Sequence, residues 1–112
     1  RKYFTLAEQT PQSETAWLAF PLIIKKSAPF TRLEIVTFLE KQNIQTRPVF
    51  TGNILKQPGF KNIPRRLAGG KFSNAENVMR NAFVIGCHQG LSKAQIKYLQ
   101  GEFAQFLGQY VR

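Results

Sequence analysis

The order of apolar and polar residues along the chain predicts three short strands. Residues 17–24 (WLAFPLII) are aromatic, β-branched and few in number, which is typical of a strand. Pro21 lies inside this run, and because proline has no backbone N–H to donate, it indicates an edge strand or a bulge. Residues 45–50 are expected to be extended, and residues 82–86 (AFVIG) are expected to form a short buried strand.

Polar residues that precede periodic apolar segments mark the helices. Thr31 and Glu34 have the spacing of a capping box, in which two side chains satisfy backbone N–H groups of the first turn. Residues 27–43 are therefore expected to form a helix. The same spacing at residues 73–76 and 92–95 predicts a short helix and then the final helix. The final helix carries one apolar stripe, formed by Ile96, Leu99, Phe103, Phe106, Leu107 and Tyr110.

The remaining segments are expected to be loops. Glycine and proline are frequent in residues 52–70, which predicts a long loop with a short helical turn near residues 53–57. Residues 1–15 are polar and are expected to be a linker or the end of an upstream element, and residues 16–112 are expected to form the domain. The fold class is therefore α+β, with about three mostly antiparallel strands and helices packed on one face.

Composition narrows the class of partner. The 112 residues include sixteen Lys and Arg but only six acids, all of them Glu, for a net charge of +10. Such a charge favours an anionic partner: nucleic acid, a membrane surface or a phosphorylated ligand. The cations are scattered and form no run of five or six, so a basic nucleic-acid tail is not indicated. The most apolar run, residues 16–24, is too short to span a bilayer. No signal peptide is visible, so a cytoplasmic location is expected.

Few residues suggest chemistry by themselves. Cys87 is the only cysteine, which excludes an internal disulfide and a cysteine cluster for a metal. Cys87 and His88 are adjacent, so in an extended segment their side chains point to opposite faces, and a packed Cys beside a loop His is favoured over a nucleophile and its base. No metal site is expected. Arg65 and Arg66 are candidates for phosphate contact, because guanidinium groups match phosphate oxygens, and a solvated pair is the competing interpretation.

The segment 46–53 (TRPVFTGN) admits two interpretations. It could be a strand that turns at Gly52, with Asn53 capping a following helix. That structural interpretation leaves Arg47 unexplained, because an arginine between strand-type residues needs an anionic or carbonyl partner if it is buried. Ligand contact by this segment is the alternative, and the residues themselves leave both open.

Several of these motifs together resemble a known family. The chain from about residue 10 onward resembles the C-terminal part of the DegT-type nucleotide-sugar aminotransferases, which are fold-type I, pyridoxal-phosphate enzymes. Within them it looks most like the branch of CDP-4-keto-6-deoxyglucose 3-dehydrases of lipopolysaccharide biosynthesis. It departs from that branch at Leu18-Ala19, Val84 and Gln89. The matching positions are Trp17, Phe20, Pro21, Thr46, Arg47, Phe50, Gly52, Asn53, Gln57, Pro58, Gly86, Gly90 and Leu91.

The resemblance implies a small C-terminal domain that packs on an upstream cofactor domain. That domain would anchor pyridoxal phosphate (PLP) or pyridoxamine phosphate (PMP) and supply the catalytic residues, so none is expected in these 112 residues. Some relatives hold an iron–sulfur cluster, which would also lie upstream because Cys87 is the only cysteine here. The family is commonly homodimeric and acts on nucleotide sugars. The isolated chain is therefore expected to be inactive.

The resemblance also implies a set of pocket residues. Phe20, Arg47, Phe50, Gly52 and Asn53 would line the sugar and cofactor pocket, with Arg47 on an anionic or carbonyl group, Asn53 in a polar contact, and the two phenylalanines in packing. The implied activity is C-3 deoxygenation of a CDP-4-keto-6-deoxyhexose in O-antigen sugar biosynthesis. The alternatives are a sugar-nucleotide aminotransferase, a free-standing basic nucleic-acid-binding module, and an interaction domain without a ligand.

Overall fold

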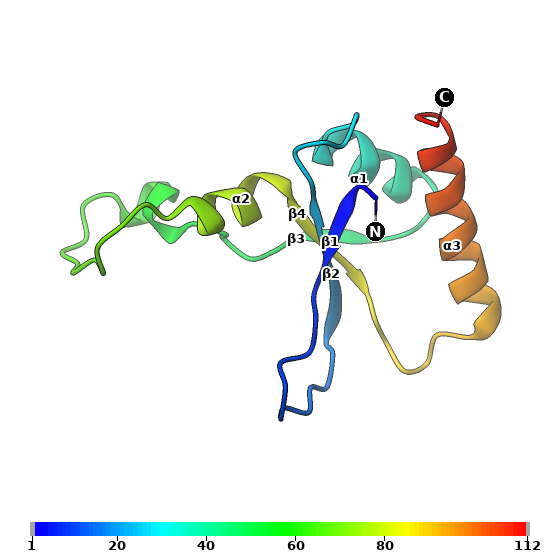
Figure 1. The fold of residues 1–112 in the computed structure, drawn as a ribbon, viewed down its shortest axis with the longest axis horizontal. Helices are drawn as coiled ribbons and strands as arrows, with labels where there is room; N and C mark the ends of the chain where they lie inside the picture. Colours follow the sequence, from blue (N-terminus) through cyan, green and yellow to red (C-terminus); the bar gives the residue numbers. More distant parts are fainter. Residues whose placement is uncertain (1, 112) are drawn as a thin grey trace.

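The fold is a single antiparallel sheet with helices packed against it. The structure is a computed structural model that describes residues 2–111. The strands lie in the order β1-β2-β4-β3, and every neighbouring pair is antiparallel (Figure 1). The strands are β1 (Phe4–Leu6), β2 (Ala19–Ile24), β3 (Thr46–Pro48) and β4 (Ala82–Gly86). The expected α+β class is confirmed, and β4 has the predicted bounds.

The strand β1 is the fourth strand, where about three were expected. It lies within residues 1–15, the segment expected to be a linker or the end of an upstream element. β1 pairs with β2, with Phe4 opposite Ile24, and the side chains of Tyr3 and Phe4 are buried in the core. Three residues are too few to show an alternating pattern in a polar segment, which explains why the sequence does not reveal this strand.

Pro21 lies in an internal strand whose register with β4 is continuous, whereas an edge strand or a bulge was expected. β2 has β1 on one side and β4 on the other. The pairing with β1 ends at Leu22, so Pro21 is flanked only by β4, where it lies opposite Val84. A missing N–H is tolerated at that position because no strand faces it on the β1 side.

The helices are α1 (Arg32–Lys41), which is shorter than the predicted span of residues 27–43, and α3 (Lys93–Gly108). Both have complete capping boxes, formed by Thr31 with Glu34 and by Ser92 with Gln95. The aromatic rings of Phe38 in α1 and Phe106 in α3 pack against each other, with centroids 5.3 Å apart. This contact joins the two helices above the sheet.

The capping box predicted at residues 73–76 was wrong. The helix α2 (Ser73–Asn81) forms, but Ser73 is its first helical residue and Phe72 precedes it without a side-chain cap. The carboxylate of Glu76 instead accepts hydrogen bonds from Arg80, at 2.6 Å, and from Asn53, at 3.4 Å. Glu76 therefore links α2 to the loop before it rather than capping its own helix.

The two faces of the sheet differ in how deeply their side chains are buried. Side chains alternate along a strand, so Leu22, Phe83 and Ile85 share one face, which packs with residues of α1 and α3 into the core. Pro21 and Val84 lie on the opposite face and are only half-buried. None of the helices within residues 2–111 has the length and apolar character needed to cross a bilayer.

Residues 50–72 form a projection, which we call the arm. It extends away from the sheet beside α2, along the longest dimension of the molecule (Figure 1). The arm contains two short 3₁₀ helices, η1 (Ile54–Lys56) and η2 (Pro58–Phe60), the first of which confirms the predicted helical turn. Residues 61–72 have no helix or strand, as expected for a long loop.

Candidate functional site

The structure separates two of the predicted pocket residues. Arg47 pairs with Val84 and therefore lies on the open face of the sheet. Phe20 pairs with Ile85, lies on the opposite face, and has 40 % of its surface exposed. The described residues thus do not bring Phe20 and Arg47 into one pocket.

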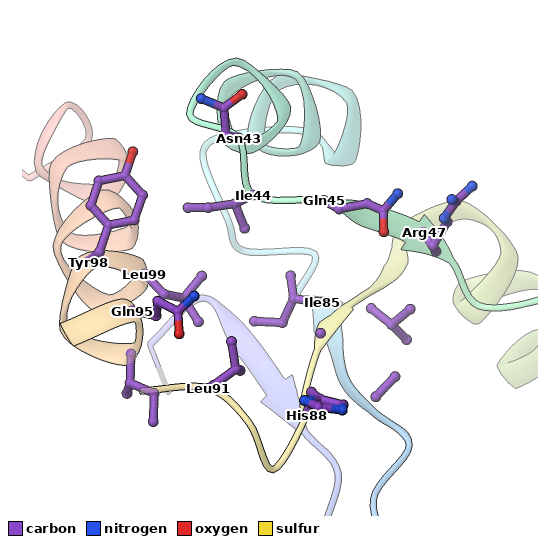
Figure 2. Close-up of a pocket in the computed structure, with 14 residues that line it drawn as sticks. Asn43, Ile44, Gln45, Arg47, Ile85, His88, Leu91, Gln95, Tyr98 and Leu99 are labelled. Atoms are coloured by element: carbon purple, nitrogen blue, oxygen red, sulfur yellow. The ribbon is translucent and has the colours of Figure 1, made fainter. Parts of the chain in front are cut away.

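Arg47 is exposed on a strand that α1 holds in place. The carboxylate of Glu40 accepts hydrogen bonds from the backbone N–H and the hydroxyl of Thr46, at 2.6 and 2.8 Å. These hydrogen bonds lower the pKa of Glu40, and the nearby charge of Arg47 adds a smaller contribution. The guanidinium of Arg47 points away from the neighbouring cavity (Figure 2) and donates no hydrogen bond within residues 2–111. It is therefore available to a ligand.

Gly52 and Asn53 fix the arm to α2. The backbone of Gly52 has a φ of +62°, and a Cβ there would lie 2.4 Å from the Cα of Met79. Asn53 is 6 % exposed, and its Oδ1 accepts a hydrogen bond from the N–H of Leu55 at 3.1 Å. Its Nδ2 is bonded to Glu76, as described above. The fold itself thus explains both residues, as the structural interpretation of the motif expects.

Phe50 is presented to solvent by a tight turn. Its φ is +41°, a left-handed conformation that is uncommon for an aromatic residue, and 92 % of its surface is exposed. The turn is closed by a hydrogen bond of 3.1 Å from the N–H of Gly52 to the carbonyl of Val49. The side-chain amide of Gln57 donates to the carbonyl of Thr51 at 3.0 Å. A constrained turn thus holds an aromatic ring away from the core.

The two loop arginines, Arg65 and Arg66, differ in their hydrogen bonds. Nη1 of Arg65 donates to the carbonyls of Phe60, Lys61 and Ile63, at 3.0, 3.0 and 3.3 Å. Arg65 therefore organises its own loop. Arg66 is exposed and has no such role within the described residues. Phosphate contact by this pair stays a prediction.

A cavity of about 370 Å³ lies between the end of β4 and the start of α3 (Figure 2). Ile85, Leu91 and Leu99 supply its apolar wall, and Arg47 and His88 are among its polar residues. A second, mostly apolar cavity of about 640 Å³ shares His88 and contains Phe20. Sequence reasoning treated His88 only as a loop residue; its position just after a buried strand is the signal that would have placed it at a pocket.

His88 has a defined arrangement in this cavity. Its Nδ1 accepts a hydrogen bond from the N–H of Gly90 at 2.9 Å, so the neutral ring carries its proton on Nε2. A Cβ at Gly90 would lie 2.8 Å from that Nδ1, so a larger residue there would require the His88 ring to shift. His88 can therefore donate one hydrogen bond to a ligand.

The described residues offer binding groups rather than a complete catalytic centre. No carboxylate and no amine lines the cavity beside Arg47. Among residues 2–111 no three His, Cys, Asp or Glu side chains gather where they could hold a metal ion. The imidazole N–H of His88 can donate to a ligand in the cavity, whereas the guanidinium of Arg47, which points away from the cavity, can bind an anionic or carbonyl group on the outer side of the strand.

Sequence comparison identifies close relatives. The chain is 34 % identical over 107 residues to the lipopolysaccharide biosynthesis protein RfbH of Salmonella typhimurium, covering 96 % of this chain and 24 % of that protein. It is 36 % identical over 98 residues to a dTDP-4-dehydro-2,6-dideoxy-D-glucose 3-dehydratase of Saccharopolyspora spinosa, covering 88 % of this chain and 21 % of the relative. The chain thus spans about a quarter of the length of these relatives, in their C-terminal region.

Comparison with solved structures finds relatives of the same kind. A structure of the E. coli GDP-4-keto-6-deoxy-D-mannose-3-dehydratase with bound hydrated PLP matches with a TM-score of 0.78 at 31 % identity, covering 89 % of this chain and 25 % of that chain. An aminotransferase from Brucella abortus has a TM-score of 0.77 at 16 % identity, covering 94 % and 26 %, and shows the same fold. The model of the DegT/DnrJ/EryC1/StrS aminotransferase family matches residues 1–103. This chain therefore belongs to the DegT/DnrJ/EryC1/StrS aminotransferase family.

Proposed function

We propose that this chain is the C-terminal part of a PLP- or PMP-dependent sugar-nucleotide 3-dehydratase. The observation that carries the proposal is the identity of 31–36 % to proteins named as 3-dehydratases, each covering 87–88 % of the chain. The aminotransferase structure, at 16 % identity, supports the fold alone. The reaction is the removal of the C-3 hydroxyl from a 4-keto-6-deoxyhexose nucleotide in the biosynthesis of lipopolysaccharide O-antigen sugars.

The nucleotide is the least constrained part of this proposal. The relatives are named for dTDP and GDP sugars, which shows that one fold accommodates different bases. We assign a CDP sugar because the motifs around Trp17 and Arg47 resemble the CDP-specific branch. A homodimeric enzyme in the cytoplasm is also part of the proposal.

The cofactor is anchored outside residues 1–112 in this proposal. The described residues alone do not fit it, because the cavity beside Arg47 has no carboxylate for the pyridine nitrogen and no lysine for the aldehyde. An iron–sulfur cluster, where present, lies outside as well, because such clusters need several cysteines and this chain has only Cys87. The isolated chain is therefore inactive.

The role of this chain is to bind and orient the substrate. The exposed guanidinium of Arg47 extends from a strand that Glu40 holds through Thr46, so the backbone that carries it is positioned before a ligand arrives. We assign it to a phosphate or carbonyl oxygen of the nucleotide sugar, which guanidinium groups bind well. Phe50 supplies an aromatic wall, and Gly52 and Asn53 hold the turn that carries it.

The test is an assay of the full-length enzyme with PMP or PLP and CDP-4-keto-6-deoxyglucose. Mass spectrometry of the nucleotide sugar, with L-glutamate or a reductase supplied, is expected to show loss of the C-3 oxygen. An amino sugar that keeps its C-3 hydroxyl would overturn the dehydratase assignment in favour of an aminotransferase.

Arg47→Ala tests the role of the guanidinium in the same assay. Loss of one charge-assisted hydrogen bond is expected to lower kcat/KM by about 10- to 100-fold. Lys97→Ala, which removes an exposed cation from α3, is the control and is expected to leave kcat/KM unchanged. If the two variants behave alike, Arg47 does not contact the substrate.

A further inference from the structure

The arm carries charge of one sign. Its five ionisable side chains are all cationic, and no acid occurs in residues 50–72. The acid that follows, Glu76, already forms an ion pair of 2.6 Å with Arg80. The arm therefore presents a uniformly positive surface. Its cations are Lys56, Lys61, Arg65, Arg66 and Lys71.

The arm also exposes large apolar side chains. None of them belongs to the hydrophobic core, which is formed by the sheet, α1, α3 and the chain segments beside them. Apolar groups gathered on a projecting segment are typical of a surface that is covered in the assembled protein. The exposed apolar residues of the arm are Phe50, Ile54, Phe60, Ile63, Leu67 and Phe72.

The arm has a defined shape although it has no core of its own. Arg65 binds three carbonyls of the loop, and Gln57 binds the carbonyl of Thr51. At its base, Gly52 packs directly on Met79 of α2. A surface organised before contact loses less conformational entropy on binding, which is the property of a docking element.

The partner of the arm needs negative charge, of which this chain has little, with six acids against sixteen Lys and Arg. Glu34, Glu40 and Glu76 are engaged with Thr31, with Thr46, and with Arg80 and Asn53. A second copy of the same residues would bring another +10 and would repel the arm. The relatives are about four times as long as this chain, which matches their C-terminal region. The acidic surface is therefore expected to lie in the segment before residue 1.

A nucleic-acid partner fits the arm less well. Nη1 of Arg65 is already bonded to three carbonyls, which removes part of one guanidinium from phosphate binding. Only half of the six exposed apolar side chains are aromatic; the other three, Ile54, Ile63 and Leu67, have no ring on which a base could stack. Aliphatic side chains beside cations suit a protein surface with apolar pockets and an acidic rim.

We propose that the arm docks on an acidic, partly apolar surface of the polypeptide segment that precedes residue 1. The cations steer and orient the contact, and the five apolar side chains that follow Phe50 become buried in it. This inference rests on the proposed function only in requiring the longer polypeptide, and no readout below depends on catalytic activity. An inactive protein with a docked arm would refute the proposed function alone.

Zero-length coupling of amines to carboxylates in the full-length protein tests the contact directly. Mass spectrometry is expected to find Lys61 and Lys71 joined to Asp or Glu residues of the preceding segment. A mixture of ¹⁵N-labelled and unlabelled protein shows whether residues 1–112 of another copy are joined instead. Coupling of the arm lysines only to residues 1–112 of a second copy would overturn the proposal.

Charge reversal provides the second test. In Lys61→Glu/Lys71→Glu, trypsin is expected to cleave after Arg65 and Arg66, which the variant retains, about tenfold faster than in the wild-type protein. The control, Lys93→Glu/Lys97→Glu on α3, makes the same change in net charge and should be cleaved at the wild-type rate. Equal protection in both variants would overturn the proposal, as would tight binding of single-stranded oligonucleotide by wild-type protein that Lys61→Glu/Lys71→Glu abolishes.

Discussion

Replacing Gly52 with alanine tests how the arm is attached to the domain. Gly52 has a φ of +62°, a conformation that residues with a Cβ rarely adopt. An added Cβ would lie 2.4 Å from both Cα and Cβ of Met79, and 2.8 Å from its backbone nitrogen. The obstacle is therefore the backbone of α2, which cannot move aside as a flexible side chain could.

Two costs add up in this variant. A left-handed conformation costs an alanine about 1–2 kcal/mol. Overpacking against the helix adds about 1–3 kcal/mol. The sum, about 2–5 kcal/mol, is a large part of the 5–15 kcal/mol that typically stabilises a domain. A loss of this size lowers the melting midpoint by at least about 8 °C in a domain of about this length.

The assay is thermal and urea unfolding of the chain, followed by circular dichroism. Gly59→Ala is the matched control, because no atom lies within 4 Å of the added Cβ, and it is expected to change the free energy of unfolding by less than about 1 kcal/mol. Adding Met79→Ala to Gly52→Ala should not restore stability, because Cα and N of residue 79 remain. Equal melting midpoints for Gly52→Ala and Gly59→Ala would refute the reasoning.

Two further predictions concern side chains that hold local structure. Asn53→Ala removes the cap of η1 and the bond to Glu76, and is expected to lower the free energy of unfolding in urea by about 1–2 kcal/mol, whereas the exposed Asn62→Ala should change it by less than about 0.5 kcal/mol. The hydrogen bonds from Thr31 lower the pKa of Glu34, so its contribution to stability is present above pH 4.5 and is lost as the pH falls through the lower pKa of the folded state. Glu34→Gln should therefore show a flatter loss of urea midpoint between about pH 6 and about pH 3, and a profile as steep as that of the wild-type chain would contradict this.

The sequence predicted a helix correctly where a capping box and a periodic apolar stripe occurred together. The boxes of Thr31 with Glu34 and of Ser92 with Gln95 each precede a periodic apolar stripe, and both helices begin there. The third match, at residues 73–76, was misleading because spacing alone cannot say which residue has the extended backbone of a cap. In α2 the carboxylate of Glu76 has better partners in Arg80 and in the arm.

The site was harder to predict because its geometry depends on strand register. Phe20 lies opposite Ile85 and Arg47 lies opposite Val84, so the two side chains leave the sheet on opposite faces. These partners are far apart in sequence, and a shift of one residue in either pairing would reverse the face. No local sequence pattern predicts which residues of two distant strands lie opposite each other. Resemblance to a family indicates which residues belong to a site, but it does not give the strand register that decides which face each one occupies.

The segment 46–53 now divides into two groups of residues. Gly52 and Asn53 are explained by contacts with α2, so their replacement should destabilise the chain itself. Arg47 and Phe50 are exposed and make no hydrogen bond or ring contact through their side chains within the described residues, so the fold gives no reason for either. Exposed side chains on a rigid, partly strained backbone are typical of functional sites. The two interpretations of the motif therefore apply to different residues: Gly52 and Asn53 build the turn, and Arg47 and Phe50 are left for the ligand contact proposed above.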